Sequence, residues 1–263
     1  MQPGIALERA KARAAGVYAL HGYLPVSLAA RIFRNGLRRL RGKADAPVTR
    51  LAQVFWPQVL KSHSIELTET DKSDGNVRLS ELAVLALAAS DVPAGNEIVE
   101  IGTFDGRTAL NLAINAPPGV SIATLDLPAD QPSALEIEAS ERRYVDKPAP
   151  GARLRSCGGP WRVYAERVAQ LSGDSATFDW SPHVGRAGLV FVDGSHAYDY
   201  VRKDSETAMR LVRPGGVVLW HDYGVWPGVN QALEEIDARL GLGLVHIAGT
   251  SLVFWRAAEG ADS

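Results

Sequence analysis

The sequence of 263 residues contains a single cysteine, Cys157, and no long run of apolar residues. One cysteine cannot form a disulfide within the chain or supply a cysteine-based zinc site, so these are excluded and a reducing compartment is indicated. A membrane-spanning helix needs roughly 20 consecutive apolar residues, and no segment supplies them. The N-terminus also lacks the short apolar region and cleavage site of a signal peptide. We therefore expect a cytoplasmic protein.

The net charge is also low, at −2, but it is unevenly distributed. Residues 1–43 hold nine Lys or Arg against one acid, Glu8, so this segment carries +8 and the remainder −10. Residues 25–41 place apolar side chains at helical spacing with arginines on another side, which is typical of a cationic amphipathic helix. Such a helix can lie peripherally on an anionic membrane, or it can pack on this chain or on a second copy in a homo-oligomer. No aromatic stacking platform accompanies the charge, so we expect no nucleic-acid partner.

The remaining composition, 46% hydrophobic and 22% charged, is that of a globular protein with one sizeable core. From residue 97 onward, short apolar runs alternate with longer segments of helical period, which predicts βαβ units around a parallel sheet. A helix is expected over residues 78–90. The expected strands are 97–101, 120–126, 167–171, 188–193, 216–222, 243–248 and 251–256. Because only Gly249 and Thr250 separate the last two, these strands must form an antiparallel hairpin.

These patterns divide the chain into a basic, helical N-terminal extension (1–77), an α/β domain (78–258) and a short tail (259–263). The segment between Asp126 and the third strand is too long for a simple crossover and contains several prolines and glycines. We expect it to hold one helix and an irregular excursion.

Ligands bind beyond the carboxyl ends of the strands in an open α/β sheet, so the residues at these ends are the candidate site. The first strand continues into VEIGTFDGRTALNLA, residues 99–113. Gly102 and Gly106 permit a tight turn into a helix whose first N–H groups can face a ligand. Their spacing differs from the dinucleotide pattern Gly-x-Gly-x-x-Gly. Glu100 precedes the turn, where its carboxylate can face a cation or hydroxyls, or pair with an arginine.

Two further strand ends carry polar residues. Asp126 ends the second strand about 20 residues after the glycine turn, where a carboxylate accepts hydrogen bonds from ribose hydroxyls or merely caps the strand. Asp174 and Ser175 follow the third strand, on a short loop where an adenine edge can be read. Because no phosphate-binding lysine motif accompanies them, the three strand ends predict a nucleoside ligand without a pyrophosphate.

Five segments resemble class I S-adenosylmethionine-dependent methyltransferases of the methyltransferase domain 24 family: VEIGTFDGRTALNLA, LDLP, GDSATFD, FVDGSHAYDYVRKD and LVRPGGVVLWHDYG. The resemblance covers residues 78–256. It implies a Rossmann-like, seven-stranded, mostly parallel sheet whose last strand is antiparallel. The cofactor-binding residues that it implies are Glu100, Gly102, Thr103 and Gly106 at the methionine part, Asp126 at the ribose, Asp174 and Ser175 at the adenine, and Asp193.

In this family the fourth and fifth strands are neighbours, and adjacent strands lie only about 4.8 Å apart. Their ends, VDGSH and LWHDY, would bring Asp193, His221 and Asp222 together. Two carboxylates and an imidazole suit a divalent cation, either Mg²⁺ or, because of the histidine, Mn²⁺. Such an ion can bind a substrate hydroxyl, lower its pKa and orient it towards the methyl group. The plainer alternatives are a turn at Asp193 and a structural hydrogen bond at His221.

The arrangement is similar to metal-dependent O-methyltransferases that act on catechols and on antibiotic sugars. The catechol enzymes carry a basic lysine three residues after the first metal-binding acid, and His196 occupies that position. Its unperturbed pKa near 6.5 suits a general base, so we expect His196 and Asp193 to be catalytic. His221 departs from the sugar-modifying relatives, which often have Asp there.

We therefore expect S-adenosylmethionine-dependent O-methylation of a hydroxyl on a sugar or another small natural-product-like acceptor. The alternatives are a metal-independent N- or O-methyltransferase and a non-catalytic nucleoside-binding module.

Overall fold

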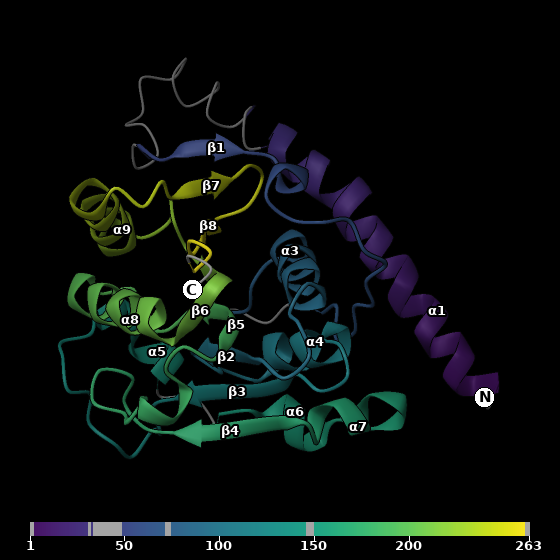
Figure 1. Cartoon of the computed structure of the whole chain (residues 1–263). Coiled ribbons are helices and arrows are strands. Elements are labelled where there is room, and N and C mark those ends of the chain that lie inside the picture. Colours follow the sequence, from purple (N-terminus) through teal and green to yellow (C-terminus); the bar gives the residue numbers. More distant parts are fainter. Residues whose placement is uncertain (1–2, 31–32, 34–48, 72–74, 146–149, 261–263) are drawn as a thin grey trace.

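The computed structural model describes residues 3–30, 33, 49–71, 75–145 and 150–260. Its centre is an eight-stranded sheet in the order β1-β7-β8-β6-β5-β2-β3-β4 (Figure 1). Among these strands, β8 alone runs antiparallel to its neighbours, β6 and β7. The strands are β1 (Ala52–Val54), β2 (Glu97–Ile101), β3 (Ser121–Asp126), β4 (Val168–Ser172), β5 (Ala187–Val192), β6 (Val212–Trp220), β7 (Val245–Ile247) and β8 (Val253–Arg256).

Strands β2 to β8 are the seven that the sequence predicts, and the reversed last strand is confirmed. Strand β1 was not predicted. It pairs with β7 in parallel at the edge of the sheet, with Gln53 opposite His246. Because an edge strand of three residues is too short to show an alternating pattern, its sequence carries no strand signal. Strand β6 also begins earlier than predicted, at Val212 instead of residue 216.

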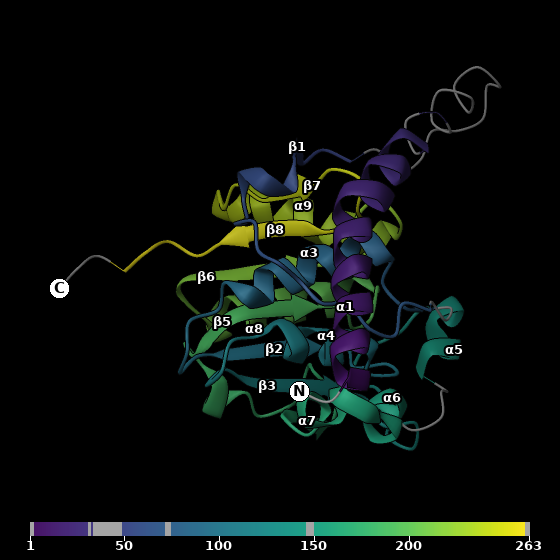
Figure 2. The same cartoon turned by 90° about the vertical axis from the view of Figure 1, so that its right-hand side faces the viewer.

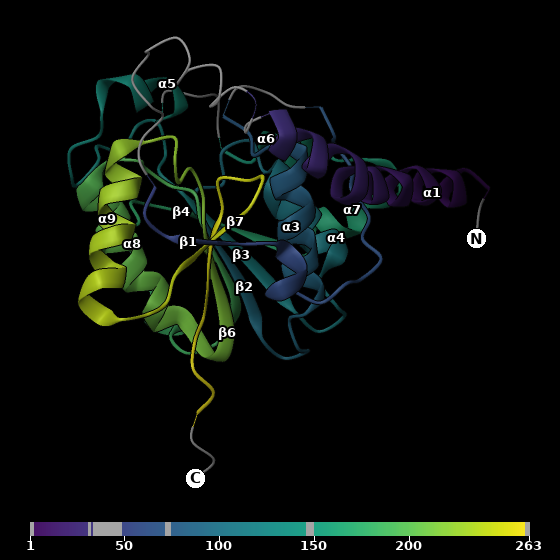
Figure 3. The same cartoon turned by 90° about the horizontal axis from the view of Figure 1, so that it is seen from above.

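Helices cover both faces of the sheet (Figure 3). Helices α8 and α9 lie on one face, and α3 and α4 lie on the other with α1 outside them. Val201, Ala208 and Leu211 form the buried face of α8, whereas α3 is buried almost all round because it lies between the sheet and the N-terminal helix. These helices are α1 (Pro3–Val17), α3 (Leu79–Ser90), α4 (Arg107–Asn115), α8 (Tyr198–Leu211) and α9 (Pro227–Leu240).

The N-terminal extension shares its core with the rest of the chain. Leu20 lies in the π-helical turn η1 (Tyr18–Tyr23), and Leu24 and Trp56 follow it along the chain. All three belong to the same buried cluster as Leu82 of α3 and Phe191 of β5. Residues on both sides of the predicted domain boundary after residue 77 therefore belong to one hydrophobic core.

Part of the predicted basic helix at 25–41 is described. Residues 24–30 are helical, and residues 31–32 and 34–41 lie outside the described part of the chain. Val26 and Phe33, from the predicted apolar face, are 67% and 68% exposed. Among the described residues, no helix is long and apolar enough to cross a membrane.

The connection between β3 and β4 contains several short helices instead of the one helix that we expected. Its residues 127–145, called the wall segment below, include η3 (Ala139–Glu141) and α5 (Arg142–Val145). Figure 2 shows α5 beyond the sheet, on the side opposite the C-terminus. The other short helices are α6 (Ala152–Ser156), η4 (Gly159–Trp161) and α7 (Arg162–Ala165). Of the predicted tail, residues 261–263 lie outside the described residues.

Candidate active site

A cavity lies at the carboxyl ends of the parallel strands, where the sequence predicts the site. The wall segment contributes Ile137, Glu141 and Tyr144 to its lining. The predicted site residues that line it are Gly102, Asp126, Asp174, Ser175, Asp193, His196 and Asp222. Trp226, which follows β6, is also part of the lining.

Gly102 allows the ends of β2 and β5 to meet closely. Its φ of +102° is a conformation that side-chain-bearing residues rarely adopt. A Cβ at this position would lie 2.0 Å from the carbonyl oxygen of Asp193. The backbone N–H of Asp193 in turn donates to the Ile101 carbonyl at 2.8 Å. Glycine at position 102 therefore lets the Asp193 backbone lie close to the end of β2, and this sets the position of the Asp193 side chain.

Glu100, Thr103 and Gly106 lie beneath this turn and not in the cavity lining. Glu100 is completely buried, and burial raises its pKa well above the usual range. The hydroxyl of Thr124 donates to Oε2 of Glu100 at 2.5 Å and lies 2.7 Å from the hydroxyl of Thr103. Gly106 begins α4, where a Cβ would clash with Leu154. These three residues support the turn, and their contact with the cofactor stays a prediction.

Asp126 and the glycine turn are directly connected. Oδ2 of Asp126 accepts a hydrogen bond from the Phe104 N–H at 2.5 Å, so the end of β3 is tied to the loop after β2. The carboxylate lies at the cavity, where the sequence places a ribose-binding acid. The contact with a ribose stays a prediction.

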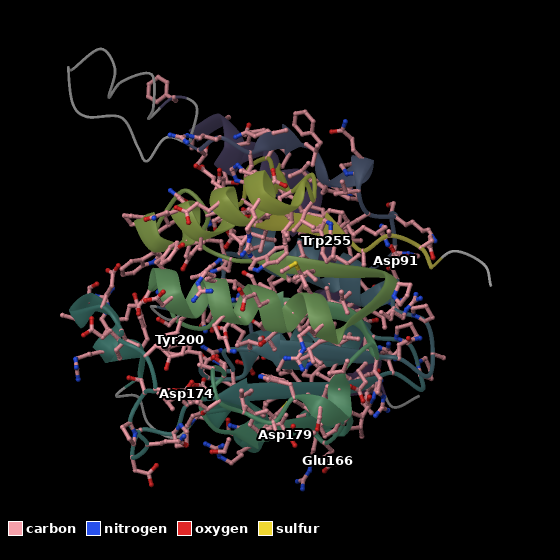
Figure 4. The ribbon with its side chains drawn as sticks, turned by 60° about the vertical axis from the view of Figure 1, so that its left-hand side comes forward. Asp91, Glu166, Asp174, Asp179, Tyr200 and Trp255 are labelled. Carbon is pink, nitrogen blue, oxygen red and sulfur yellow. The ribbon has the colours of Figure 1, made fainter. Side chains whose placement is uncertain are left out.

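Asp174 holds the wall segment in place. Its Oδ2 accepts hydrogen bonds from the Tyr200 hydroxyl and the Ala134 N–H, both at 2.6 Å (Figure 4). Its Oδ1 accepts one from the Ala176 N–H at 2.8 Å. Because protein donors already engage both oxygens, this carboxylate shapes the cavity, and reading of an adenine at Asp174 and Ser175 stays a prediction.

Asp193, His196 and Asp222 form the group of potential metal ligands in the described part of the chain. Each offers one ligand atom, and these atoms all lie within 4.8 Å of one another. His221, which the sequence suggests as the third ligand, is paired through both ring nitrogens. Its Nδ1 lies 2.8 Å from Oδ1 of Asp193, and its Nε2 lies 3.1 Å from Oε2 of Glu81. The geometry adds His196 to the candidate ligand set, and binding of the ion by His221 stays a prediction.

Charges of both signs alternate in this cluster. Burial acts to lower the pKa of His221, but the carboxylates of Asp193, Asp222 and Glu81 outweigh it and raise that pKa well above its usual value. Burial likewise acts to raise the pKa of Asp222, and the two histidines outweigh it, so this pKa is lowered. The His221 ring therefore connects the end of β6 to Glu81 of α3.

His196 lies between two carboxylates. Nε2 is 2.8 Å from Oδ2 of Asp222, and Nδ1 is 2.7 Å from Oε1 of Glu141. Burial opposes the charged ring, but these two acids raise the pKa of His196 to about 9. The role of His196 as a general base stays a prediction.

The sequence alone does not identify Glu141 or Glu81 as part of the site. Glu141 lies in the irregular wall segment, where periodicity carries no information, and Glu81 looks like an ordinary first-turn residue of α3. Trp226, which follows β6, forms another part of the cavity wall. Its ring is stacked on His196, with centroids 4.5 Å apart and planes inclined by 3°.

Residues 99–223 match the model of a methyltransferase domain family. Among solved structures, the O-methyltransferase NovP has a TM-score of 0.54 at 17% identity, covering 69% of this chain and 81% of NovP. The O-methyltransferase TomG from Streptomyces achromogenes, in complex with SAM, has a TM-score of 0.48 at 22% identity, covering 74% and 92%. An O-methyltransferase from Bacillus cereus, in complex with SAH, has a TM-score of 0.46 at 18% identity, covering 73% and 84%. A comparison with curated protein sequences gives no match.

Proposed function

We propose that this chain, a class I S-adenosylmethionine-dependent methyltransferase, methylates a hydroxyl of a sugar or another small natural-product-like acceptor, assisted by a divalent ion. One observation carries the proposal. The ligand atoms of Asp193, His196 and Asp222 converge at the same cavity that Asp126 and Ser175 line. A nucleoside-containing cofactor and an ion-bound acceptor can therefore share one space.

The donor set fits a divalent cation. Two carboxylate oxygens favour Mg²⁺, and the imidazole nitrogen also admits Mn²⁺. The ion would compensate the negative charge that Asp193 and Asp222 gather at the ends of β5 and β6. When bound, it lowers the pKa of an acceptor hydroxyl and so makes the oxygen a better nucleophile.

The residues around the cavity hold and shield the reactants. Asp126 is the acceptor for the ribose hydroxyls, and Gly102 lets the cofactor approach the backbone. Tyr144 packs edge-to-face against both Phe104 and His196, and Trp226 is stacked on the His196 ring. These aromatic side chains exclude water and offer flat, apolar faces to the carbon skeleton of an acceptor.

The first experiment is a calorimetric titration of S-adenosylmethionine into the full chain, with and without Mg²⁺. We expect saturable one-site binding in both conditions. Absence of binding in both would contradict the cofactor assignment.

Metal dependence is tested by transfer of a labelled methyl group to a panel of vicinal-diol sugars and catechols, in EDTA and after Mg²⁺ is added back. We expect EDTA to abolish transfer while cofactor binding persists, and Mg²⁺ to restore transfer. Full transfer in EDTA would leave a metal-independent methyltransferase. Cofactor binding with no transfer to any acceptor would favour a nucleoside-binding module.

A further inference from the structure

The wall segment is hydrogen-bonded to other residues of the cavity lining at two places. Near its middle, the Ala134 N–H donates to Asp174 at 2.6 Å and the Leu135 N–H donates to the Tyr200 hydroxyl at 3.4 Å. Further along, Glu141 reaches the loop that follows β5 and contacts Ser195 and His196. This second attachment links the wall segment to the candidate metal ligands.

The Glu141 carboxylate is deeply buried, since the residue is only 3% exposed. Oε2 accepts a hydrogen bond from the Ser195 hydroxyl at 2.9 Å, and Oε1 accepts one from the His196 N–H at 2.5 Å. A buried carboxylate is costly unless it is paired and hydrogen-bonded, and these contacts satisfy it at this place.

Oε1 of Glu141 also lies 2.7 Å from Nδ1 of His196. This is an ion-pair contact and not an aligned hydrogen bond. On the opposite side of the ring, Nε2 faces Asp222, and one ring face is covered by Trp226. Glu141 therefore supplies the contact that holds the Nδ1 side of the ring and leaves Nε2 directed at the two acids.

Histidines that bind metals commonly direct their second ring nitrogen at a carboxylate, which orients the ring and raises its basicity as a ligand. We propose that Glu141 is a positioning residue that holds His196 so that its Nε2 joins Asp193 and Asp222 around the divalent ion. This inference rests on the ion of the proposed function. It adds that the wall segment, which lines the cavity proposed to hold the acceptor, contributes to the affinity of the site for the metal ion.

The test measures binding of Mn²⁺ alone to the full chain, by calorimetry and by electron paramagnetic resonance, without cofactor or acceptor. For Glu141→Ala we expect the Kd for Mn²⁺ to rise roughly 10- to 100-fold. Glu141→Gln keeps the size and shape of the side chain but removes the charge and replaces one acceptor oxygen with an NH₂ donor, so we expect a smaller rise. The matched control is Glu138→Gln, an exposed residue of the same segment, which should keep the wild-type Kd.

Thermal unfolding of each variant separates positioning from folding. A purely structural role for Glu141 would lower the Tm and leave the Kd for Mn²⁺ unchanged in the folded protein, and that result would overturn the inference. If Glu141→Ala fails to fold, Glu141→Gln decides by the same criterion. If the wild-type chain itself does not bind Mn²⁺, the ion of the proposed function is refuted, and this inference with it.

Discussion

Replacement of Gly102 by alanine tests how closely the ends of β2 and β5 meet. The new Cβ would lie 2.0 Å from the carbonyl oxygen and 2.5 Å from the carbonyl carbon of Asp193. Ordinary contacts of a Cβ begin at 3.4 Å, so the two strand ends would have to separate by about 1 Å or more. Both partners are backbone atoms, and no side-chain rotation can relieve the clash.

Two costs contribute to the expected loss of stability. Placing alanine at a positive φ costs about 1–2 kcal/mol, and forcing extra volume into a packed site costs about 1–3 kcal/mol. Gly102→Ala should therefore lower the free energy of unfolding by roughly 2–5 kcal/mol. Gly95→Ala is the matched control, because Gly95 has a φ of +83° and no described atom lies within 4 Å of its added Cβ. It should show only the first cost, about 1–2 kcal/mol.

The assay is urea unfolding of wild type and both variants, followed by circular dichroism at a fixed pH. Calorimetry of S-adenosylmethionine on the folded variants is the second readout, since Gly102 and Asp193 both line the cavity. We expect weaker cofactor binding in Gly102→Ala and unchanged binding in Gly95→Ala. Equal destabilisation by the two substitutions would refute the close approach of the strand ends.

Three other predictions concern a buried acid, the cofactor and the extension. Burial raises the pKa of Asp204 to about 7, because its effect outweighs that of the Ser175 hydroxyl, which acts to lower this pKa. The folded state therefore holds the proton more tightly than the unfolded state, and the wild type should lose stability as the pH rises from about 4 to 7. Asp204→Asn should remove that loss and unfold at higher urea than wild type at pH 8 but not at pH 4; parallel pH profiles would contradict this. Asp126→Ala should weaken S-adenosylmethionine binding roughly 10- to 100-fold in calorimetry, because a hydrogen bond to a charged group is lost, and an unchanged Kd would remove Asp126 from the ribose site. We also expect the full chain to float with anionic vesicles and the double variant Val26→Ser, Phe33→Ser to float less, whereas equal flotation would argue against membrane contact by residues 25–41.

The order and direction of the main strands follow from local patterns. Buried parallel strands appear as short apolar runs such as residues 97–101 and 188–193, and helices appear as longer periodic segments, so both can be recognised without a structure. Polar residues at the ends of such runs share one edge of a parallel sheet, and this rule alone placed Asp126, Asp174 and Asp193 at the cavity. Strand β1 escaped detection because its pairing partner, and not its own sequence, makes it a strand.

The roles of the two histidines were decided by tertiary contacts. His196 and His221 both follow apolar strands and look equivalent in the sequence. Glu81, 140 residues before His221, contacts that ring, and Glu141, 55 residues before His196, contacts the ring of His196. Local periodicity contains no information about which distant carboxylate will face a given ring. The sequence by itself therefore determined the fold and the edge at which the site lies, whereas only the packing of α3 and the wall segment decided that Glu81 faces His221 and Glu141 faces His196.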